Sequence, residues 1–536
     1  MDLPLPFLVS TLGVSAIVCY VLFFLSGKAV EGRRRRPPLP PGPRGWPVLG
    51  NLPQLGGKTH QTLHEMTKVY GPLLRLRFGS SDVVVAGSAA VAEQFLRIHD
   101  ANFSCRPPNS GGEHMAYDYQ DVVFAPYGPR WRAMRKVCAV NLFSARALDD
   151  LRAVREREAA LMVKALVREE ASSTAPQAVL LVPLGRAVNV CTTNALSRAA
   201  VGLRVFAEDG NKEGATREFK EIVLEVMRVG GVLNVGDFVP ALRWLDPQRV
   251  VANMKKLHRR FDDMMNGIIS ERRSSRFQQP AADEESNKDL LGLLLAMVQT
   301  EQPLTGGDED RITDTYIKAL ILNLFVAGTD TTSTIVEWSL AEMIRHPDIL
   351  NQAQEELDAV VGRDRLVSES HLPSLTFFNA VIKETFRLHP STPLSLPRMA
   401  ADDCEVAGYR IPKGSELLVN VWGIARDPAL WPDPLEFRPA RFLPGGSHEN
   451  VDVKGADFQL IPFGAGRRIC AGLSWGLRMV TLASATLVHA FHWELPVGQT
   501  PDNLNMDEAF TLLLQRAVPL MVQPVPRLLP SAYQTA

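Results

Sequence analysis

A short glycine-rich loop around the last cysteine constrains this chain more than any other feature. Residues 462–472 read PFGAGRRICAG, which places Cys470 two residues after Arg468 and two residues before Gly472. Glycines let a backbone approach a flat group closely, and backbone N–H groups of such a loop can point at the sulfur and keep it deprotonated. A single thiolate held in this way is suited to a haem iron, and Arg468 is suited to a haem propionate. A lone cysteine would more often be a buried free thiol, but five fixed positions argue against that reading.

The spacing of this loop resembles the signature of the cytochrome P450 superfamily of haem-thiolate monooxygenases. The match rests on Phe463, Gly466, Arg468, Cys470 and Gly472. The resemblance implies a mainly α fold with small β-sheets, in which Cys470 is the metal ligand of haem b and the other four positions lie against the cofactor. It also implies dioxygen as cosubstrate and electrons that come indirectly from NADPH.

The composition limits the class of protein to which this chain can belong. The chain has 536 residues, of which 46% are hydrophobic, so a large core is available. Lysine and arginine total 58 against 59 acidic residues, a balance that gives no electrostatic reason to expect nucleic acid as a partner. Six cysteines are scattered without paired spacing, which argues against a disulfide framework or a zinc site and favours a reducing compartment.

The N-terminal segment is predicted to be a membrane anchor. Residues 7–25 carry no charge, and about 20 apolar residues are needed to span a bilayer core. Lys28 and the arginines at 33–36 follow, whereas Asp2 precedes the run, so the positive flank should face the cytosol. A cleaved signal peptide would carry its positive charge before the apolar run. We therefore expect an anchor at 1–27, a basic and proline-rich hinge at 28–45, and a haem-thiolate monooxygenase domain at 46–536.

The proline-rich stretch after the basic residues resembles the hinge of microsomal P450 proteins. Residues 37–43 read PPLPPGP, which forms a stiff, extended connector. The resemblance implies a single-pass protein of the endoplasmic reticulum membrane, in contact with membrane lipid, whose catalytic domain faces the cytosol.

The apolar periodicity of the remaining chain is mainly helical. Helical spacing is seen at 151–169, 313–344 and 375–388. Residues 73–78 and 83–86 flank a turn and predict a hairpin, and strand-like pieces occur at 404–411 and 510–522. The polar stretches 274–288 and 306–310 are predicted to be exposed loops.

The long helical pattern at 313–344 contains residues near its centre that are poor helix formers. Residues 327–332 read AGTDTT, and glycine and threonine are poor helix formers whose presence can distort a helix locally. A groove there could hold dioxygen and water, with Asp330 and Thr331 passing protons. Taken alone the motif could be a flexible helix centre. Together with the cysteine loop it resembles the oxygen-activation motif of the monooxygenases, which assigns catalytic positions to Ala327, Gly328, Asp330 and Thr331.

Two further motifs carry arginines. Glu384 and Arg387 share a helix face, and in isolation such a pair is worth little. With Arg441 they resemble the Glu-Arg-Arg triad of the family, for which we expect a structural role.

The second set of arginines is expected at the cofactor. Trp131 and Arg135 have i, i+4 spacing, and the resemblance implies that they face one haem propionate while Arg398 reaches the other. The sequence contains no glycine-rich dinucleotide fingerprint after a strand. Electrons should therefore come from a partner, which the resemblance identifies as the membrane-bound NADPH-cytochrome P450 reductase.

Several segments narrow the resemblance to the plant flavonoid B-ring hydroxylases, and most to the flavonoid 3'-hydroxylase branch. The segments are 106–114, 124–128, 389–398 and 451–455. The implied substrate is a flavonoid hydroxylated at the 3' position of its B-ring. Candidate pocket residues are Asn109, Ser110, Leu396 and Leu513, with the loop 109–119 roofing the pocket.

Two departures from the branch leave other activities open. Residues 306–309 read GGDE where GGEK is usual, and Leu513 stands where the branch typically has a hydroxyl-bearing residue. Leucine favours an apolar substituent, so 5'-hydroxylation of a 3'-methoxylated flavone (chrysoeriol 5'-hydroxylation, towards tricin) is an alternative, alone or in addition. More remote alternatives are an oxygen-independent haem-thiolate isomerase and a haem protein without turnover.

Overall fold

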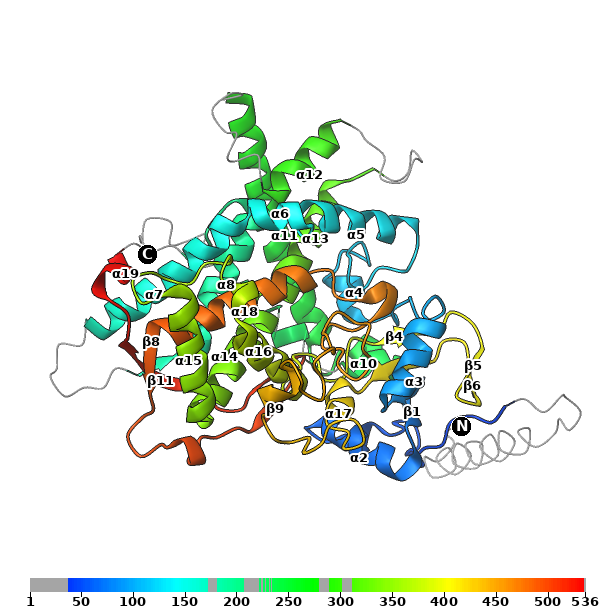
Figure 1. Cartoon of the computed structure of the whole chain (residues 1–536). Coiled ribbons are helices and arrows are strands. Elements are labelled where there is room, and N and C mark those ends of the chain that lie inside the picture. Colours follow the sequence, from blue (N-terminus) through cyan, green and yellow to red (C-terminus); the bar gives the residue numbers. More distant parts are fainter. Residues whose placement is uncertain are drawn as a thin grey trace, which may run out of the picture.

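Helices dominate the structure, a computed structural model that describes residues 37–171, 181–206, 221–222, 225–226, 228–230, 232, 234–278, 289–300 and 311–534. Among these residues the strands form one four-stranded, one three-stranded and two two-stranded sheets. In Figure 1 the strands β1 (Leu73–Phe78), β4 (Arg398–Met399), β5 (Cys404–Val406) and β6 (Tyr409–Ile411) lie towards the right, beside short helices such as α3 (Ala89–Glu93), and most of the longer helices lie towards the left and the top. The expectation of a mainly α chain with small sheets is confirmed.

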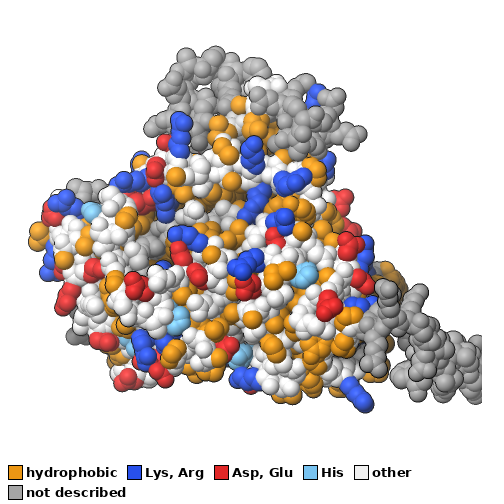
Figure 2. Space-filling view, turned by 45° about the vertical axis from the view of Figure 1, so that its right-hand side comes forward, with side chains coloured by type: hydrophobic (Ala, Val, Ile, Leu, Met, Phe, Trp, Pro, Cys, Tyr) orange, Lys and Arg blue, Asp and Glu red, His pale blue; other side chains and the backbone are white. Residues whose placement is uncertain are grey.

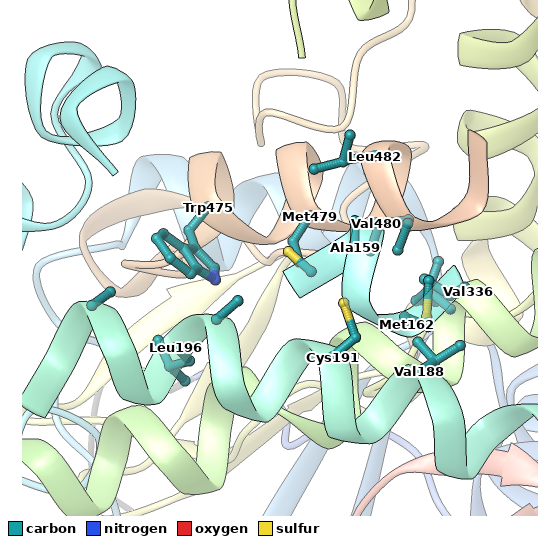
Figure 3. Close-up of a cluster of buried hydrophobic side chains, with 14 of the residues drawn as sticks. Ala159, Met162, Val188, Cys191, Leu196, Val336, Trp475, Met479, Val480 and Leu482 are labelled. Carbon is teal, nitrogen blue, oxygen red and sulfur yellow. The ribbon is translucent and has the colours of Figure 1, made fainter. Parts of the chain in front are cut away.

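Four helices build the centre of the core: α7 (Arg152–Ala171), α8 (Leu184–Val201), α14 (Asp330–Arg345) and α18 (Leu473–Ala490). Their apolar side chains interdigitate in Figure 3, where residues from all four are drawn. The buried members include Met162, Cys191, Val336 and Met479. Because α18 follows the cysteine loop directly, packing of this helix also fixes the end of the loop.

The long apolar stretch predicted at 313–344 forms two helices in line. Helix α13 (Asp314–Gly328) ends at the glycine of the AGTDTT motif, and Thr329 separates it from α14 with φ −93° and ψ −72°. Within the described part of the chain, 314–345 is the one helical run long and apolar enough to cross a membrane, but most of it is buried, as expected of a core helix. The predicted anchor, and the hinge up to residue 36, lie outside the described residues.

The four-stranded sheet has the order β1-β2-β7-β4. The predicted hairpin is confirmed as β1 (Leu73–Phe78) and β2 (Ser81–Ala86), paired antiparallel from Leu73 opposite Ala86 to Phe78 opposite Ser81. Strand β7 (Glu416–Val419) runs parallel to β2, and β4 (Arg398–Met399) closes the other edge. This sheet therefore places Arg398 at a defined position.

The remaining strands are β3 (Val182–Pro183), β5 (Cys404–Val406), β6 (Tyr409–Ile411), β8 (Phe491–Glu494), β9 (Glu508–Phe510), β10 (Leu514–Arg516) and β11 (Met521–Pro526). Of these strands, two lie within the predicted region 404–411, one lies within 510–522 and two overlap its ends, whereas the strands at 182–183 and 491–494 were not predicted. Charged side chains of both signs are interspersed over the face shown in Figure 2, in line with the near-neutral balance of the sequence.

The remaining α-helices are α2 (Thr59–Tyr70), α3 (Ala89–Glu93), α4 (Ser110–His114), α5 (Pro129–Asn141), α6 (Ala145–Asp150), α10 (Val235–Phe238), α11 (Val250–Gln278), α12 (Leu290–Gln299), α15 (Pro347–Val361), α16 (Thr376–Leu388), α17 (Val421–Ile424) and α19 (Pro530–Gln534).

The loop prediction at 274–288 was wrong for its first residues, because the helix anchored by buried Phe261, Met265 and Ile269 continues to Gln278. The rest of that stretch, and 306–310, lie outside the described residues.

Candidate active site

The cysteine loop is a tight turn between a short 3-10 helix (Gly466–Arg468) and α18. The backbone N–H of Cys470 donates to Phe463 O at 2.9 Å and closes the loop. Gly466 has φ +69°, and a Cβ built on it would lie 2.4 Å from both Asp100 Oδ1 and Leu96 O. Both the backbone conformation and the space therefore require glycine at this position.

The thiol of Cys470 is surrounded by protein and yet accessible. Its side chain is exposed, while burial raises the pKa of the thiol and the Gly472 N–H and the Arg135 charge act in the opposite direction. A thiol in this loop, with a backbone N–H beside the sulfur, fits a thiolate ligand of haem iron.

Four arginines gather beside this loop: Arg106, Arg135, Arg398 and Arg468. Burial lowers the pKa of Arg398 and of Arg468 to about 10 and that of Arg106 well below its usual range, and repulsion between the guanidinium groups contributes to each shift. Asp100 and Asp121 are the acidic side chains that act on this cluster. Buried cations in excess of their counter-charges are stabilised by a bound anion, so the cluster fits a group that carries two carboxylates, as haem does.

Arg106 was not predicted as a cofactor residue. Its Nη1 donates to Leu396 O and Pro397 O, both at 2.7 Å, and its Nε to Val123 O at 3.2 Å. The sequence offered this arginine only as part of a segment typical of flavonoid hydroxylases. Its place beside Arg398 and Arg468 depends on a contact between positions about 290 residues apart, which local patterns do not reveal.

Trp131 lies beside the cysteine loop, in contact with two of these arginines. Its indole N–H donates to Val122 O at 2.9 Å, so this donor is already used within the protein. The guanidinium groups of Arg468 and Arg135 lie over the indole ring at 4.3 and 5.3 Å from its centroid. The indole ring is a platform that holds two arginines, and the role of Trp131 at a propionate stays a prediction.

The AGTDTT motif opens the helix as the sequence indicated. The hydroxyl groups of Thr329, Thr331 and Thr332 donate to the backbone oxygens of Phe325, Ala327 and Gly328, at 2.9, 2.7 and 3.1 Å. Ala327 is exposed within a helix whose other residues are mostly buried, so this turn faces open space. A Cβ on Gly328 would lie 2.6 Å from Leu196 Cδ2, which explains why α8 can pack closely here.

Asp330, the first residue of α14, points towards α8. Asn189 Nδ2 donates to Asp330 Oδ1 at 2.5 Å. Burial raises the pKa of this carboxyl group, and the hydrogen bond from Asn189 opposes the shift. Asn189 was not among the predicted site residues.

Glu384, Arg387 and Arg441 form a fully buried cluster. Both oxygens of Glu384 accept from Arg387, at 2.7 and 2.8 Å, and Arg441 Nε lies 3.4 Å from Glu384 Oε1. Arg387 also donates to the carbonyl oxygens of Ala425, Pro434 and Glu436. The three charged side chains thus tie α16 to the chain segment 425–441.

The predicted roof of the pocket contains two polar side chains that bind other parts of the protein. Ser110 is fully buried, and its hydroxyl donates to Asp237 Oδ1 at 2.6 Å and accepts from Asn234 at 2.8 Å. The side chain of Asn109 caps α4 by accepting from Gly112 N at 2.9 Å. Both polar groups thus have protein partners, and their assignment as contacts for a substrate stays a prediction. Ser110 holds α4 onto α10.

The other two pocket candidates differ in exposure. Leu396 is half-buried and follows Ser395, whose φ is +55°. Leu513, in the turn between β9 and β10, is 3% exposed, and Thr511 N donates to its carbonyl oxygen at 3.2 Å. Its side chain is therefore enclosed in this structure.

Comparisons with known proteins agree with this geometry. Residues 40–523 match the family model described as Cytochrome P450. A flavonoid 3'-monooxygenase of Oryza sativa subsp. japonica is 76% identical over 100% of this chain and 99% of its own length. A flavonoid 3'-monooxygenase of Petunia hybrida is 59% identical over 94% and 95%, and a flavonoid 3',5'-hydroxylase of Crocosmia x crocosmiiflora is 52% identical over 97% of each chain. Among solved structures, a zebra fish cytochrome P450 with abiraterone matches with a TM-score of 0.69 at 24% identity, over 87% of this chain and 99% of that chain, which confirms the predicted fold.

Proposed function

The chain belongs to the cytochrome P450 family, and from this premise we propose that it hydroxylates the B-ring of flavonoids at the 3' position. The observation that carries the proposal is 76% identity to a flavonoid 3'-monooxygenase along the whole chain. Membership of the family implies haem b and dioxygen, with electrons that come from NADPH through a reductase.

The residues at the site divide into three roles under this proposal. Cys470 would hold the haem iron, and the arginines at 106, 135, 398 and 468 would neutralise the propionates. Haem ligated by a thiolate would supply the oxygen activation. Asp330 and Thr331 lie where α13 meets α14 and would hold and pass protons there.

A competition assay tests the proposed activity. Membranes that contain this protein and a plant reductase receive NADPH with equal concentrations of apigenin, naringenin and chrysoeriol, and products are identified by mass and retention. We expect 3'-hydroxylated products from apigenin and naringenin. Absence of any NADPH-dependent hydroxylation would contradict the proposal, and a product formed without NADPH would favour an isomerase.

The same assay tests a second activity, 5'-hydroxylation of a 3'-methoxylated flavone. One observation favours it, the 52% identity to a flavonoid 3',5'-hydroxylase. Conversion of chrysoeriol would support this activity, and an untouched chrysoeriol pool would exclude it.

Thr331→Ala tests the proton-delivery role. Proton transfer by a positioned group contributes roughly 10²–10⁴-fold to a rate, so we expect product formed per NADPH to fall by about tenfold or more. Haem content should stay unchanged, and the lost reducing equivalents should appear as hydrogen peroxide. Thr331→Ser keeps the hydroxyl that bonds Ala327 O at 2.7 Å and should retain most of the coupling. Product per NADPH at the wild-type level in Thr331→Ala would contradict the proton-delivery role of Thr331.

We also propose that residues 1–27 anchor the protein in the endoplasmic reticulum membrane with the remaining chain in the cytosol. Exposed aromatic and aliphatic side chains support contact with lipid: Trp46 is 61% and Trp244 is 80% exposed. Their two segments meet at the β1–β2 turn, where Gly79 N donates to Leu49 O and Ser80 N to Phe238 O. Tryptophan side chains favour the membrane interface. The reductase would then approach the side that carries Cys470, where Arg467 is partly exposed and paired with Asp100.

A further inference from the structure

We propose that Asn189 of α8 is a positioning residue that holds the Asp330 carboxyl group in place as a proton donor for the proposed monooxygenation. The proposal rests on the proposed function and extends it to a residue outside the recognised motifs. Asn189 and Asp330 are 141 positions apart, and their side chains meet at 2.5 Å.

The geometry fixes the direction of this hydrogen bond. The Thr193 hydroxyl lies 3.5 Å from Asn189 Oδ1 and donates to it, and this orientation turns the amide NH₂ group of Asn189 towards Asp330. Asn189 binds Asp330 Oδ1, which leaves Oδ2 as the oxygen that can carry a proton. Both residues are half-buried, so the pair lies between the interior and the solvent.

A neutral partner matters for the chemistry. A lysine or arginine at this place would stabilise the carboxylate and keep it ionised, whereas an amide orients the group without adding a charge. Burial and the Asn189 hydrogen bond are the two influences on the pKa of Asp330 in the described part of the chain, and burial prevails. The carboxyl group therefore retains its proton to a higher pH than an exposed aspartate does.

Solvent water supplies the protons that the reaction consumes. Hydroxylation consumes one dioxygen, two electrons and two protons per substrate, and releases one water. Asp330 gives a proton from Oδ2 towards the Thr331 hydroxyl and the reacting oxygen, and it is reprotonated by water at the exposed edge of the pair. Asn189 itself neither gains nor loses a proton in this sequence.

The main alternative is that the hydrogen bond only ties α8 to α14. Asn194, on the same helix, provides a matched control because it is fully buried and makes two hydrogen bonds with the backbone of Phe206, at 2.8 and 3.1 Å. Asn194→Leu removes the same side-chain amide group and its hydrogen bonds, but at a place that does not contact Asp330. A purely structural role for Asn189 predicts similar effects of Asn189→Leu and Asn194→Leu.

The experiment compares full-length variants in membranes with reductase. In Asn189→Leu, we expect product per NADPH to fall about tenfold, the scale on which loss of a supporting partner acts, with more peroxide and a larger solvent isotope effect. The reduced carbon-monoxide spectrum should show unchanged haem-thiolate content. Asn194→Leu should lower the yield of folded protein and leave the coupling unchanged. In an Asp330→Asn background, Asn189→Leu should cause no further loss, since it acts through Asp330.

A second readout does not depend on turnover. Infrared difference spectra of the resting protein, with Asp330→Asn as reference, report protonation of this one carboxyl group. We expect it to titrate above the usual range of aspartate, and Asn189→Lys to lower that titration and move the alkaline limit of activity to lower pH. This measurement also serves if Asn189→Leu fails to fold.

Three results would overturn the inference. The first is wild-type product per NADPH in Asn189→Leu, and the second is a loss from Asn189→Leu that is as large in the Asp330→Asn background as in the wild-type background. The third is an Asp330 titration that Asn189→Lys leaves unchanged. If the wild-type protein hydroxylates none of the flavonoids, the proposed function fails instead. The infrared titration would still decide whether Asn189 controls Asp330.

Discussion

Replacing Cys470 with serine should abolish the haem-thiolate spectrum and the NADPH-dependent hydroxylation. The sulfur is the atom that would meet the iron, and an alcohol does not give up its proton to the metal as readily as a thiol does. We expect turnover to fall by more than the roughly 100-fold that loss of a residue supporting a metal ligand can cost. The reduced carbon-monoxide difference spectrum measures the first effect and product formation the second.

Cys404→Ser is the matched control for this variant. Cys404 lies on β5, is half-buried, and burial raises the pKa of its thiol, as it does for Cys470. It is not part of the glycine-rich loop, so the spectrum and turnover should stay close to those of the wild type. Full turnover in Cys470→Ser would show that the loop does not hold the catalytic group.

The sequence indicated the local geometry of segments whose contacts lie between nearby residues, while the role of these segments as a site stays a prediction. The cysteine loop, the AGTDTT turn and the Glu384–Arg387 pair each lie within about ten residues, so the spacing itself brings the groups together. The helix break at Thr329 was anticipated as a local distortion, because threonine hydroxyls compete for backbone oxygens. The pattern could not show that it divides the run into α13 and α14.

Contacts between distant segments were not predictable in this way. Asn189 meets Asp330 only because α8 packs against the α13–α14 junction, where Gly328 leaves room for Leu196. Likewise, Ser110 was assigned to the pocket from its position in the predicted roof. The sequence did not indicate that its hydroxyl donates to Asp237, a residue 127 positions away. Side-chain partners of this kind depend on tertiary packing, which periodicity does not encode.

Glu384→Ala should destabilise the protein more than any surface substitution. Glu384 and Arg387 are each 0% exposed, and Arg441 is 2% exposed. Removal of the carboxylate leaves two buried guanidinium groups without their counter-charge, and breaking a buried pair in this way costs about 3–5 kcal/mol. Arg438 N also loses its acceptor, Glu384 Oε1 at 2.8 Å. We expect a lower midpoint of thermal unfolding and less protein that retains haem.

Two control variants separate the effect of removing the buried charge from the effect of removing a side chain. Glu384→Gln keeps the volume and one acceptor oxygen but not the charge, so its effect should lie between wild type and alanine. Glu65→Ala breaks a surface pair with Lys68, whose members are 67% and 56% exposed, and should cost less than about 1 kcal/mol. The triad lies in the segment that leads from α16 towards the cysteine loop, so its loss should release haem before the helical core unfolds. Equal thermal midpoints for Glu384→Ala and Glu65→Ala would contradict this account of the triad.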